Sequence, residues 1–294
     1  MPSTFVDAEI ASQPQTWAQA AALALTPAVA RALPRPGERV AVVGCGTSWF
    51  VAMSVAVLRE QAGHGVTDAF AGSEFPVGRG YDRVVAISRS GTTTEIVELL
   101  ARLDGTATTL ITAVGGSPAA ASADLTVELP FADERSVVQT RFATAALTLL
   151  RAHLGTEVSP LVDDARRALE VPVDELLIVD QCTFVGIGWC VGLANEAALK
   201  TREAAQFWAE AYPAMDYRHG PIAIAQPGRL VWSIGEAPVG LREDVAATGA
   251  TFVQHDLEPQ AALVVAQRFA VALSKQRGLD PDRPRSLTRS VILA

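Results

Sequence analysis

Cysteine and basic charge are both scarce in this sequence. The three cysteines, Cys45, Cys182 and Cys190, have a spacing that fits neither a metal site nor a redox pair. We therefore expect reduced, buried thiols and no bound metal. Lys and Arg number 24 against 32 Asp and Glu, which gives a formal net charge of -8. Nucleic acid requires a clustered basic face, so we expect no nucleic-acid partner.

The sequence also lacks a membrane-spanning or targeting segment. Its first residues have neither the basic start nor the apolar core of a secretory signal. The Ala- and Leu-rich stretch at 17–33 is too short to span a membrane and is interrupted by Gln19, Pro27 and Arg31. It therefore predicts an amphipathic helix, and we expect a cytoplasmic protein without a membrane partner.

Motifs for two common classes of cofactor are missing as well. The G-x-G-x-x-G pattern of dinucleotide-binding proteins fails after GCGTSW at 44–49, and no acidic residue ends the next strand in the usual way. No glycine-rich turn is followed by the Gly-Lys-Ser/Thr of a nucleoside-triphosphate loop. We expect no cofactor.

What the sequence does contain is an alternation of short apolar, β-branched runs with longer helical patterns. Its 49% hydrophobic and 19% charged residues allow a large core. The alternation predicts parallel sheets with helices on both faces. In the first half we expect strands at 39–46, 82–88, 107–114 and 124–130, and helices at 47–63, 93–103 and 135–154.

The same alternation begins again in the second half. Here we expect strands at 182–188, 229–235 and 251–257, and helices at 191–212, 242–250 and 260–278. Residues 176–181 fit either a strand or a connection, and 281–294 form a tail that could end in a strand. The stretch at 158–175, rich in Pro, Asp and Glu, marks the expected boundary. We predict two α/β domains of roughly 130 residues each, at 1–160 and 161–294.

Two strand-to-helix junctions concentrate glycines and hydroxyls. Gly44 and Gly46 precede Thr47 and Ser48 in the first, and residues 88–95 read SRSGTTTE in the second. Backbone N–H groups at a helix N-terminus suit phosphate oxygens, and doubly wound sheets bind ligands at the carboxyl ends of their strands. Ser48 and Thr93 could each be an ordinary helix cap, but the repeated design favours an anion site.

These junctions, together with GSEF at 72–75, resemble the sugar isomerase (SIS) domain family. The resemblance is strongest to the isomerase module of glucosamine-6-phosphate synthase and to stand-alone relatives that process amino-sugar phosphates. It extends to EIASQP at 9–14 and to residues 134–150, 195–221 and 282–291. The resemblance implies two doubly wound parallel-sheet domains in tandem, each of the SIS, flavodoxin-like type.

The resemblance also assigns roles to the junction residues. The residues that would hold the sugar 6-phosphate are Ser48, Ser88, Arg89, Ser90 and Thr93, and Thr47 would lie beside the sugar. The family often has glutamine where this chain has Arg89. Arginine adds charge and bidentate reach toward phosphate, unless it points to solvent or pairs with an acid such as Glu95.

The helix expected at 191–212 carries Lys200, Glu203 and Glu210. A glutamate one turn from a lysine can serve as a base, although such a pair is most often a solvated helix pair. We expect Glu210 to be structural. The resemblance assigns Glu203 as the base that moves a proton between sugar C1 and C2, Lys200 to substrate binding, and His219 of the RHGP loop to ring opening. In the family this histidine reaches the neighbouring subunit's site, which implies a homodimer with a shared active site.

Two features depart from the synthase. No cysteine stands near the start of the chain, so we expect no glutamine-hydrolysing domain here. Arg289 occupies the position of a lysine that can form a Schiff base. An arginine stays charged and does not readily form an imine, although it could bind or screen the substrate.

Three functions fit this set of residues. We expect a small-molecule sugar-phosphate partner, specifically an amino-sugar 6-phosphate, and aldose–ketose isomerisation with deamination. A lyase or dehydratase that eliminates the C3 substituent is the second possibility. A non-catalytic regulator that binds a sugar phosphate is the third, and it would not need Glu203 and His219.

Overall fold

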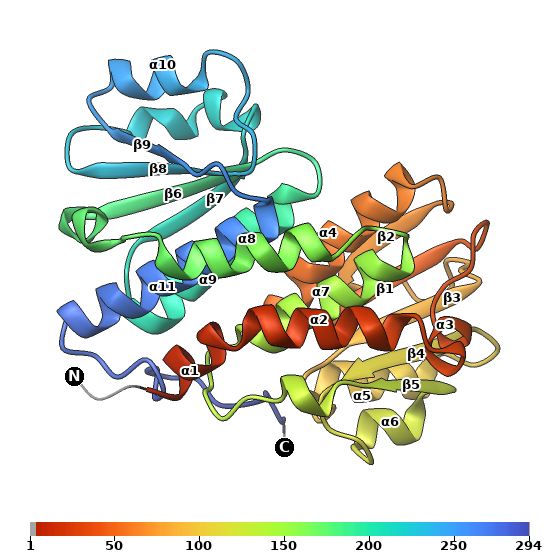
Figure 1. Ribbon diagram of the computed structural model, residues 1–294. Helices are drawn as coiled ribbons and strands as arrows, with labels where there is room; N and C mark the ends of the chain where they lie inside the picture. Colours follow the sequence, from red (N-terminus) through yellow and green to blue (C-terminus); the bar gives the residue numbers. More distant parts are fainter. Residues whose placement is uncertain (1–3, 294) are drawn as a thin grey trace. The chain divides into compact units, whose positions relative to one another are not determined.

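The computed structural model describes residues 4–293, in which nine strands form two parallel sheets (Figure 1). The described chain divides into two compact units with one sheet each. The five-stranded unit takes residues 15–134, 141–159 and 288–293, and the four-stranded unit takes 4–14, 135–140 and 160–287. The expected mixed α/β architecture with parallel sheets is confirmed.

The five-stranded unit has the strand order β2-β1-β3-β4-β5. Its strands are β1 (Val40–Gly44), β2 (Thr67–Ala71), β3 (Arg83–Ile87), β4 (Ala107–Thr112) and β5 (Leu125–Glu128). Its helices are α2 (Gln13–Ala24, most of which lies in this unit), α3 (Pro27–Ala32), α4 (Thr47–Gln61), α5 (Thr94–Arg102), α6 (Pro118–Ser122) and α7 (Arg141–His153). All residues of β1 and β3 are buried, and all but Arg83 are apolar or glycine, as is typical of parallel strands that are covered on both faces. Ile96, Leu99 and Leu100 of α5 pack against them in one core cluster.

The four-stranded unit repeats this order as β7-β6-β8-β9. Its strands are β6 (Gln181–Gly186), β7 (Ala209–Pro213), β8 (Arg229–Ile234) and β9 (Thr251–Gln254). Its helices are α1 (Phe5–Ala11), α8 (Ser159–Glu170), α9 (Cys190–Ala205), α10 (Leu241–Ala247) and α11 (Pro259–Gln276). In each unit the first strand along the chain lies between the second and the third, so the chain reverses direction across the sheet at that point.

One expected helix is wrong in its second half. The helix predicted at 191–212 ends at Ala205, because Gln206 adopts a left-handed conformation with φ 50° and caps it. The chain then returns as β7, whose Ala209 lies opposite Cys182 of β6. Glu210 is therefore on a strand and not on the same helix as Glu203.

The helix predicted at 135–154 begins only at Arg141. The Glu9 carboxylate accepts the N–H groups of Arg135 and Ser136 at 2.6 and 3.3 Å, and the Glu134 carboxylate accepts the Arg141 N–H at 2.9 Å. Glu134 thereby satisfies the Arg141 N–H, which a helix starting at 135 would have bonded to the carbonyl of residue 137. Glu9 binds the first N–H groups of the segment that precedes α7. Residues 135–140 consequently run as a non-helical segment.

Other expectations need smaller corrections. The helix predicted at 17–33 is two helices, since Pro27 begins α3. The boundary stretch at 158–175 contains α8, and 174–178 form a short 3₁₀ helix. Strand β2 was not predicted, and no strand is present in the described part of the tail, 281–293.

Candidate functional site

Strands β1 and β3 bring the two hydroxyl-rich junctions together. The strands are parallel neighbours, with Gly44 opposite Ile87 at their carboxyl ends. The junction loops, residues 45–48 and 88–93, therefore leave the same edge of the sheet. This is the point where the strand order reverses, and open α/β sheets bind ligands there.

Most predicted residues of the junction loops are held firmly in the fold. The exposed fractions of Thr47, Ser48, Ser88 and Ser90 are 3%, 3%, 4% and 7%. Gly91 has φ +62°, and a Cβ added there would lie 2.0 Å from the Ser117 hydroxyl oxygen. Only glycine fits this position, so the bend of the second loop depends on it.

The helices that follow these loops begin without side-chain caps. Gly46 is the N-cap residue of α4 and Thr93 that of α5, and neither makes a side-chain cap hydrogen bond. Ser48 lies inside the first turn of α4 rather than at its cap. Ser48 is therefore not the cap of α4, and Thr93 stands at the cap position of α5 without a capping bond from its side chain. Helix N-termini without side-chain caps suit an anion.

Arg89 lies inside the fold. Its exposed fraction is 2%, and its guanidinium Nη1 lies 3.5 Å from a carboxylate oxygen of Glu134. Burial lowers the pKa of Arg89, while the Glu134 charge opposes that shift. Arg89 thus does not point to solvent. It pairs with an acid, as the other alternative held, but that acid is Glu134 rather than Glu95.

Helix α9 of the four-stranded unit carries a row of three charged side chains. Lys200, 1% exposed, lies 3.5 Å from a carboxylate oxygen of Glu196 and also bonds to Glu203. The Glu203 side chain remains 18% exposed. The alternative of a solvated surface pair does not apply, because the lysine is buried. Glu196 was missed from the sequence, although its spacing of four residues before Lys200 is a signal for such contact.

Glu203 lines a hollow of about 420 Å³ in the same unit. The lining residues are Leu199, Arg202, Glu203, Gln206, Phe207, Arg285, Ser286 and Leu287. Gln206 and Ser286 have φ of 50° and 63°. They are the only residues other than glycine with positive φ in the described chain. Strained backbone of this kind gathers at functional sites.

His219 is exposed in a loop that the core anchors on both sides. It follows the 3₁₀ turn Asp216–Arg218 and precedes Gly220, which has φ 128°. Tyr217 is fully buried, and Arg218 bonds to the Asp244 carboxylate at 2.7 Å and to the Val239 carbonyl at 2.8 Å. The backbone next to His219 is therefore fixed while its imidazole stays accessible.

The predicted site residues fall into two groups. Thr47, Ser48, Ser88, Arg89, Ser90 and Thr93 all belong to the five-stranded unit, and Lys200, Glu203 and His219 belong to the four-stranded unit. Within the second group, Lys200 and Glu203 are in direct contact.

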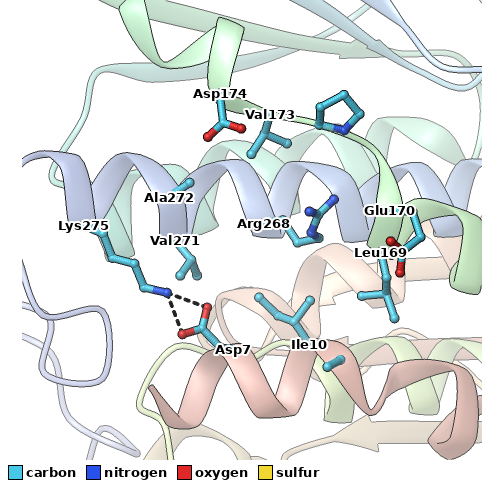
Figure 2. A pocket seen from close by; sticks show the side chains of 12 residues that line it. Asp7, Ile10, Leu169, Glu170, Val173, Asp174, Arg268, Val271, Ala272 and Lys275 are labelled. Carbon is cyan, nitrogen blue, oxygen red and sulfur yellow. Dashed lines mark hydrogen bonds and ion pairs between the residues drawn. The ribbon is translucent and has the colours of Figure 1, made fainter. Parts of the chain in front are cut away.

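A second hollow, of about 510 Å³, contains none of the predicted residues (Figure 2). Two of its walls come from α1 and α11, where the Lys275 ammonium bonds to both carboxylate oxygens of Asp7 at 2.8 and 2.6 Å. Arg268 of α11 donates to the carbonyl groups of Ala168 and Val171. Three of the charged groups here are therefore engaged in holding the elements of the unit together.

The sequence of residues 35–154 matches the SIS domain family. This region is a SIS domain. It contains both junction loops, so the resemblance predicted from their sequence is confirmed. The region makes up the greater part of the five-stranded unit.

Curated relatives align with most of the chain. The chain is 26% identical to a glutamine–fructose-6-phosphate aminotransferase (isomerizing) of Sulfolobus acidocaldarius, with 86% of this chain and 50% of the relative covered. It is 29% identical to the protein of the same name from Methanothermobacter thermautotrophicus, with 86% and 51% covered. The chain therefore spans about half the length of these relatives.

Solved structures share the fold over nearly the whole chain. A glucosamine-6-phosphate deaminase from Thermotoga maritima has a TM-score of 0.79 at 24% identity, with 99% of this chain and 100% of that chain covered. A tagatose-6-phosphate ketose/aldose isomerase from Escherichia coli has a TM-score of 0.80 at 19% identity, with 99% and 96% covered. By sequence and by fold, the chain is thus similar to proteins that act on phosphosugars. None of the helices described at 4–293 is long and apolar enough to cross a membrane.

Proposed function

We propose that this protein is an enzyme that isomerises a sugar 6-phosphate, with an amino-sugar 6-phosphate as substrate and release of ammonia. The observation that carries the proposal is the Lys200–Glu203 pair. A buried ammonium holds a carboxylate that is partly exposed on the wall of a hollow. This is the arrangement a general base needs, because the group is fixed in place and still accessible. The relatives and structural neighbours are named for activities on sugar phosphates, which supports the class of substrate.

The junction loops are the proposed phosphate site. Ser48, Ser88, Ser90 and Thr93 supply hydroxyl donors, and α4 and α5 supply helix N-termini without side-chain caps. Thr47, beside Ser48, would contact the sugar. A phosphate held here fixes the substrate, and the binding energy of a group remote from the reaction serves to orient the reacting carbons.

The proposed chemistry begins with ring opening by His219. Glu203 then removes the proton from C2 of the open-chain 2-amino aldose. The C2–H electron pair forms a C1–C2 double bond as the C1=O π pair moves to O1, which takes up a proton. Glu203 returns its proton to C1 while the amine lone pair forms a C2=N bond, and water replaces the nitrogen of this imine, which leaves as ammonia. The products are a ketose 6-phosphate and ammonia. Lys200, which bonds to Glu203, positions the base. We further propose a homodimer with a shared active site, in which the exposed His219 of one subunit contributes to the active site of the neighbouring subunit.

We also propose that the four-stranded unit is a second SIS-type domain, in tandem with the first. The shared strand order supports this, as does a shared packing detail. A Cβ added at Gly44, the last residue of β1, would lie 2.4 Å from the backbone of Ser48, and one added at Gly186, the last residue of β6, would lie 2.4 Å from the backbone of Cys190. Both helices therefore start against the preceding strand in the same way. The predicted domain bounds, 1–160 and 161–294, belong to this proposal.

The test is to incubate the pure protein with glucosamine 6-phosphate, N-acetylglucosamine 6-phosphate and fructose 6-phosphate in separate assays. Ammonia release from the first supports the proposal. An ultraviolet-absorbing product formed without ammonia from the second indicates elimination of the C3 substituent instead. Tight binding without turnover of any of the three indicates a regulator.

A matched pair of variants tests the base. Glu203→Gln should lower kcat by about 10²–10⁴-fold and leave the affinity for inorganic phosphate unchanged. Glu210→Gln is the control, because Glu210 lies on β7 and accepts hydrogen bonds from Trp208 and Tyr212. Its activity should stay close to that of the wild type. Full activity of Glu203→Gln would refute the assignment.

The double variant Ser90→Ala/Thr93→Ala tests the phosphate site. It should weaken the binding of inorganic phosphate and sugar phosphate, because two of the proposed donors are lost. Ser122→Ala is the control, since that hydroxyl donates to the Pro118 carbonyl within α6. Equal affinity of the double variant and the wild type would exclude the junction loops as the phosphate site.

A further inference from the structure

Arg89 is tied to two different parts of the five-stranded unit. One guanidinium nitrogen, Nη1, lies 3.5 Å from a carboxylate oxygen of Glu134, and the side chains of both residues are at most 1% exposed. The other, Nη2, donates to the backbone carbonyl of Arg289 at 3.0 Å. The planar guanidinium can donate hydrogen bonds to partners on two different sides at the same time. The single side chain therefore joins the second junction loop to α7 and to the C-terminal segment.

Glu134 is itself fixed in place. Its second carboxylate oxygen accepts the N–H of Arg141, the first residue of α7, at 2.9 Å. Its backbone carbonyl accepts a hydrogen bond from the Arg289 side chain, which also pairs with Asp133. A buried guanidinium is strongly favoured to remain with a partner of opposite charge. The orientation of Arg89 is thus set by protein groups.

The C-terminal segment, residues 289–293, lies along the same loop. The N–H of Thr94, which opens α5, donates to the Val291 carbonyl at 3.1 Å, and the Leu293 N–H donates to the Thr94 hydroxyl at 2.9 Å. The Thr92 hydroxyl bonds to that of Ser290 at 2.9 Å. A helix N-terminal amide of the proposed phosphate site is therefore occupied by this segment.

Apolar burial contributes little to holding the segment. Val291, Ile292 and Leu293 are 53%, 68% and 62% exposed. The hydrophobic effect scales with the area removed from water, so these side chains supply only a small part of its stabilisation. Hydrogen bonds and the Arg289 ion pair hold the segment. Two of these bonds connect it to buried residues, one from Arg89 to the Arg289 carbonyl and one from the Arg289 side chain to the Glu134 carbonyl.

We propose that Arg89 is a positioning residue that fastens residues 289–293 to the second junction loop, and that it is not a ligand of the substrate phosphate. The claim that Arg89 is not a phosphate ligand rests on the proposed function. A glutamine at this position would have no charge to hold against Glu134. The chain's arginine therefore couples the C-terminal segment to the junction loop through a buried ion pair.

Amide hydrogen exchange measured by mass spectrometry tests the fastening without any assay of activity. The peptides to follow cover residues 88–96 and 286–294. Arg89→Gln and Glu134→Gln should each speed exchange in both peptides at least tenfold, and the double variant should exchange no faster than the faster single variant. Arg102→Gln, an exposed arginine on α5, is the control and should exchange like the wild type. Unchanged exchange in Arg89→Gln overturns the fastening.

Titration with inorganic phosphate tests the claim that Arg89 is not a phosphate ligand. Arg89→Gln should bind phosphate within fivefold of the wild type, and a greater loss of affinity shows that Arg89 is a ligand. Should Arg89→Gln fail to fold, Arg89→Lys replaces it, because lysine keeps the charge beside Glu134 but cannot serve both directions. Absence of phosphate binding in the wild type refutes the proposed phosphate site, while the exchange experiment still decides the fastening.

Discussion

Replacing Lys200 with methionine perturbs the charged row of α9 at its centre. Lys200 and Glu196 are each 1% exposed, and the ammonium lies 3.5 Å from the Glu196 carboxylate. Methionine is unbranched and fills a similar path through the core, so the loss of packing is small. The main effect is that the buried Glu196 carboxylate loses this ammonium.

The size of the effect distinguishes a buried pair from a surface pair. Removing one partner of a buried ion pair costs about 3–5 kcal/mol, whereas an exposed pair on a helix contributes about 0.3–0.5 kcal/mol. With a urea dependence of about 2–3 kcal/mol per M, the unfolding midpoint of Lys200→Met should fall by about 1–2.5 M.

Urea unfolding followed by circular dichroism measures this shift. The double variant Glu196→Gln/Lys200→Met should recover part of the lost stability, because the uncompensated charge is gone. Arg166→Met is the matched control, since Arg166 pairs with Asp163 on the exposed face of α8, with side chains 63% and 70% exposed. The control should change stability by less than about 0.5 kcal/mol. A stability loss below about 0.5 kcal/mol in Lys200→Met would show that Lys200 and Glu196 interact like an exposed pair, and would refute the argument from burial.

Three further outcomes are expected. Gly91→Ala should lower stability in thermal unfolding by about 2 kcal/mol or more, because its Cβ would overlap the Ser117 hydroxyl. The control Gly105→Ala, also at positive φ but with open space around its Cβ, should cost about 1 kcal/mol. Equal losses in the two variants would contradict the packing argument. Burial and the Glu95 charge raise the pKa of the Cys45 thiol to about 11, so iodoacetamide should modify it slowly at pH 8, and reaction at the rate of a small free thiol would exclude this environment. Burial raises the pKa of Asp7, but bonds from Lys275 and Thr4 outweigh that and leave it below its ordinary value. The stabilising contribution of the Asp7 carboxylate is therefore present above its ordinary pKa and is lost as the pH falls through its pKa in the folded protein. Urea unfolding at pH 2–7 should show that Asp7→Asn loses less stability than the wild type below a pH of about 4.

Much of the fold could be predicted because its signals are local. The apolar runs of β1 and β3 and the helical spacing of α5 are properties of consecutive residues, and they specify both the elements and the parallel sheet. Glycines at the strand ends marked the two junction loops in the same way. Their position at the carboxyl ends of strands, where doubly wound sheets bind ligands, could be predicted, whereas their adjacency comes from the pairing of β1 with β3 in the sheet.

The errors arose where distant residues decide the local structure. Residues 209–213 have a helical pattern, yet they form β7 because β6 offers a parallel partner. Residues 135–140 lie outside α7. Glu9, more than 120 residues earlier in the chain, accepts two of their N–H groups, and Glu134 takes the Arg141 N–H that a longer helix would have used. No window of sequence contains such a partner.

The sequence by itself determined the class of fold, the SIS resemblance and the identity of the hydroxyl-rich loops. Tertiary structure decided what the charged residues do. Arg89 and Lys200 are charges that sequence patterns place equally well on a surface. In the fold each is buried beside a carboxylate, because the desolvation of a charge is tolerated only where the packing supplies a partner of opposite sign. That partner is fixed by the arrangement of whole elements, Glu134 ahead of α7 for Arg89 and Glu196 one turn back on α9 for Lys200.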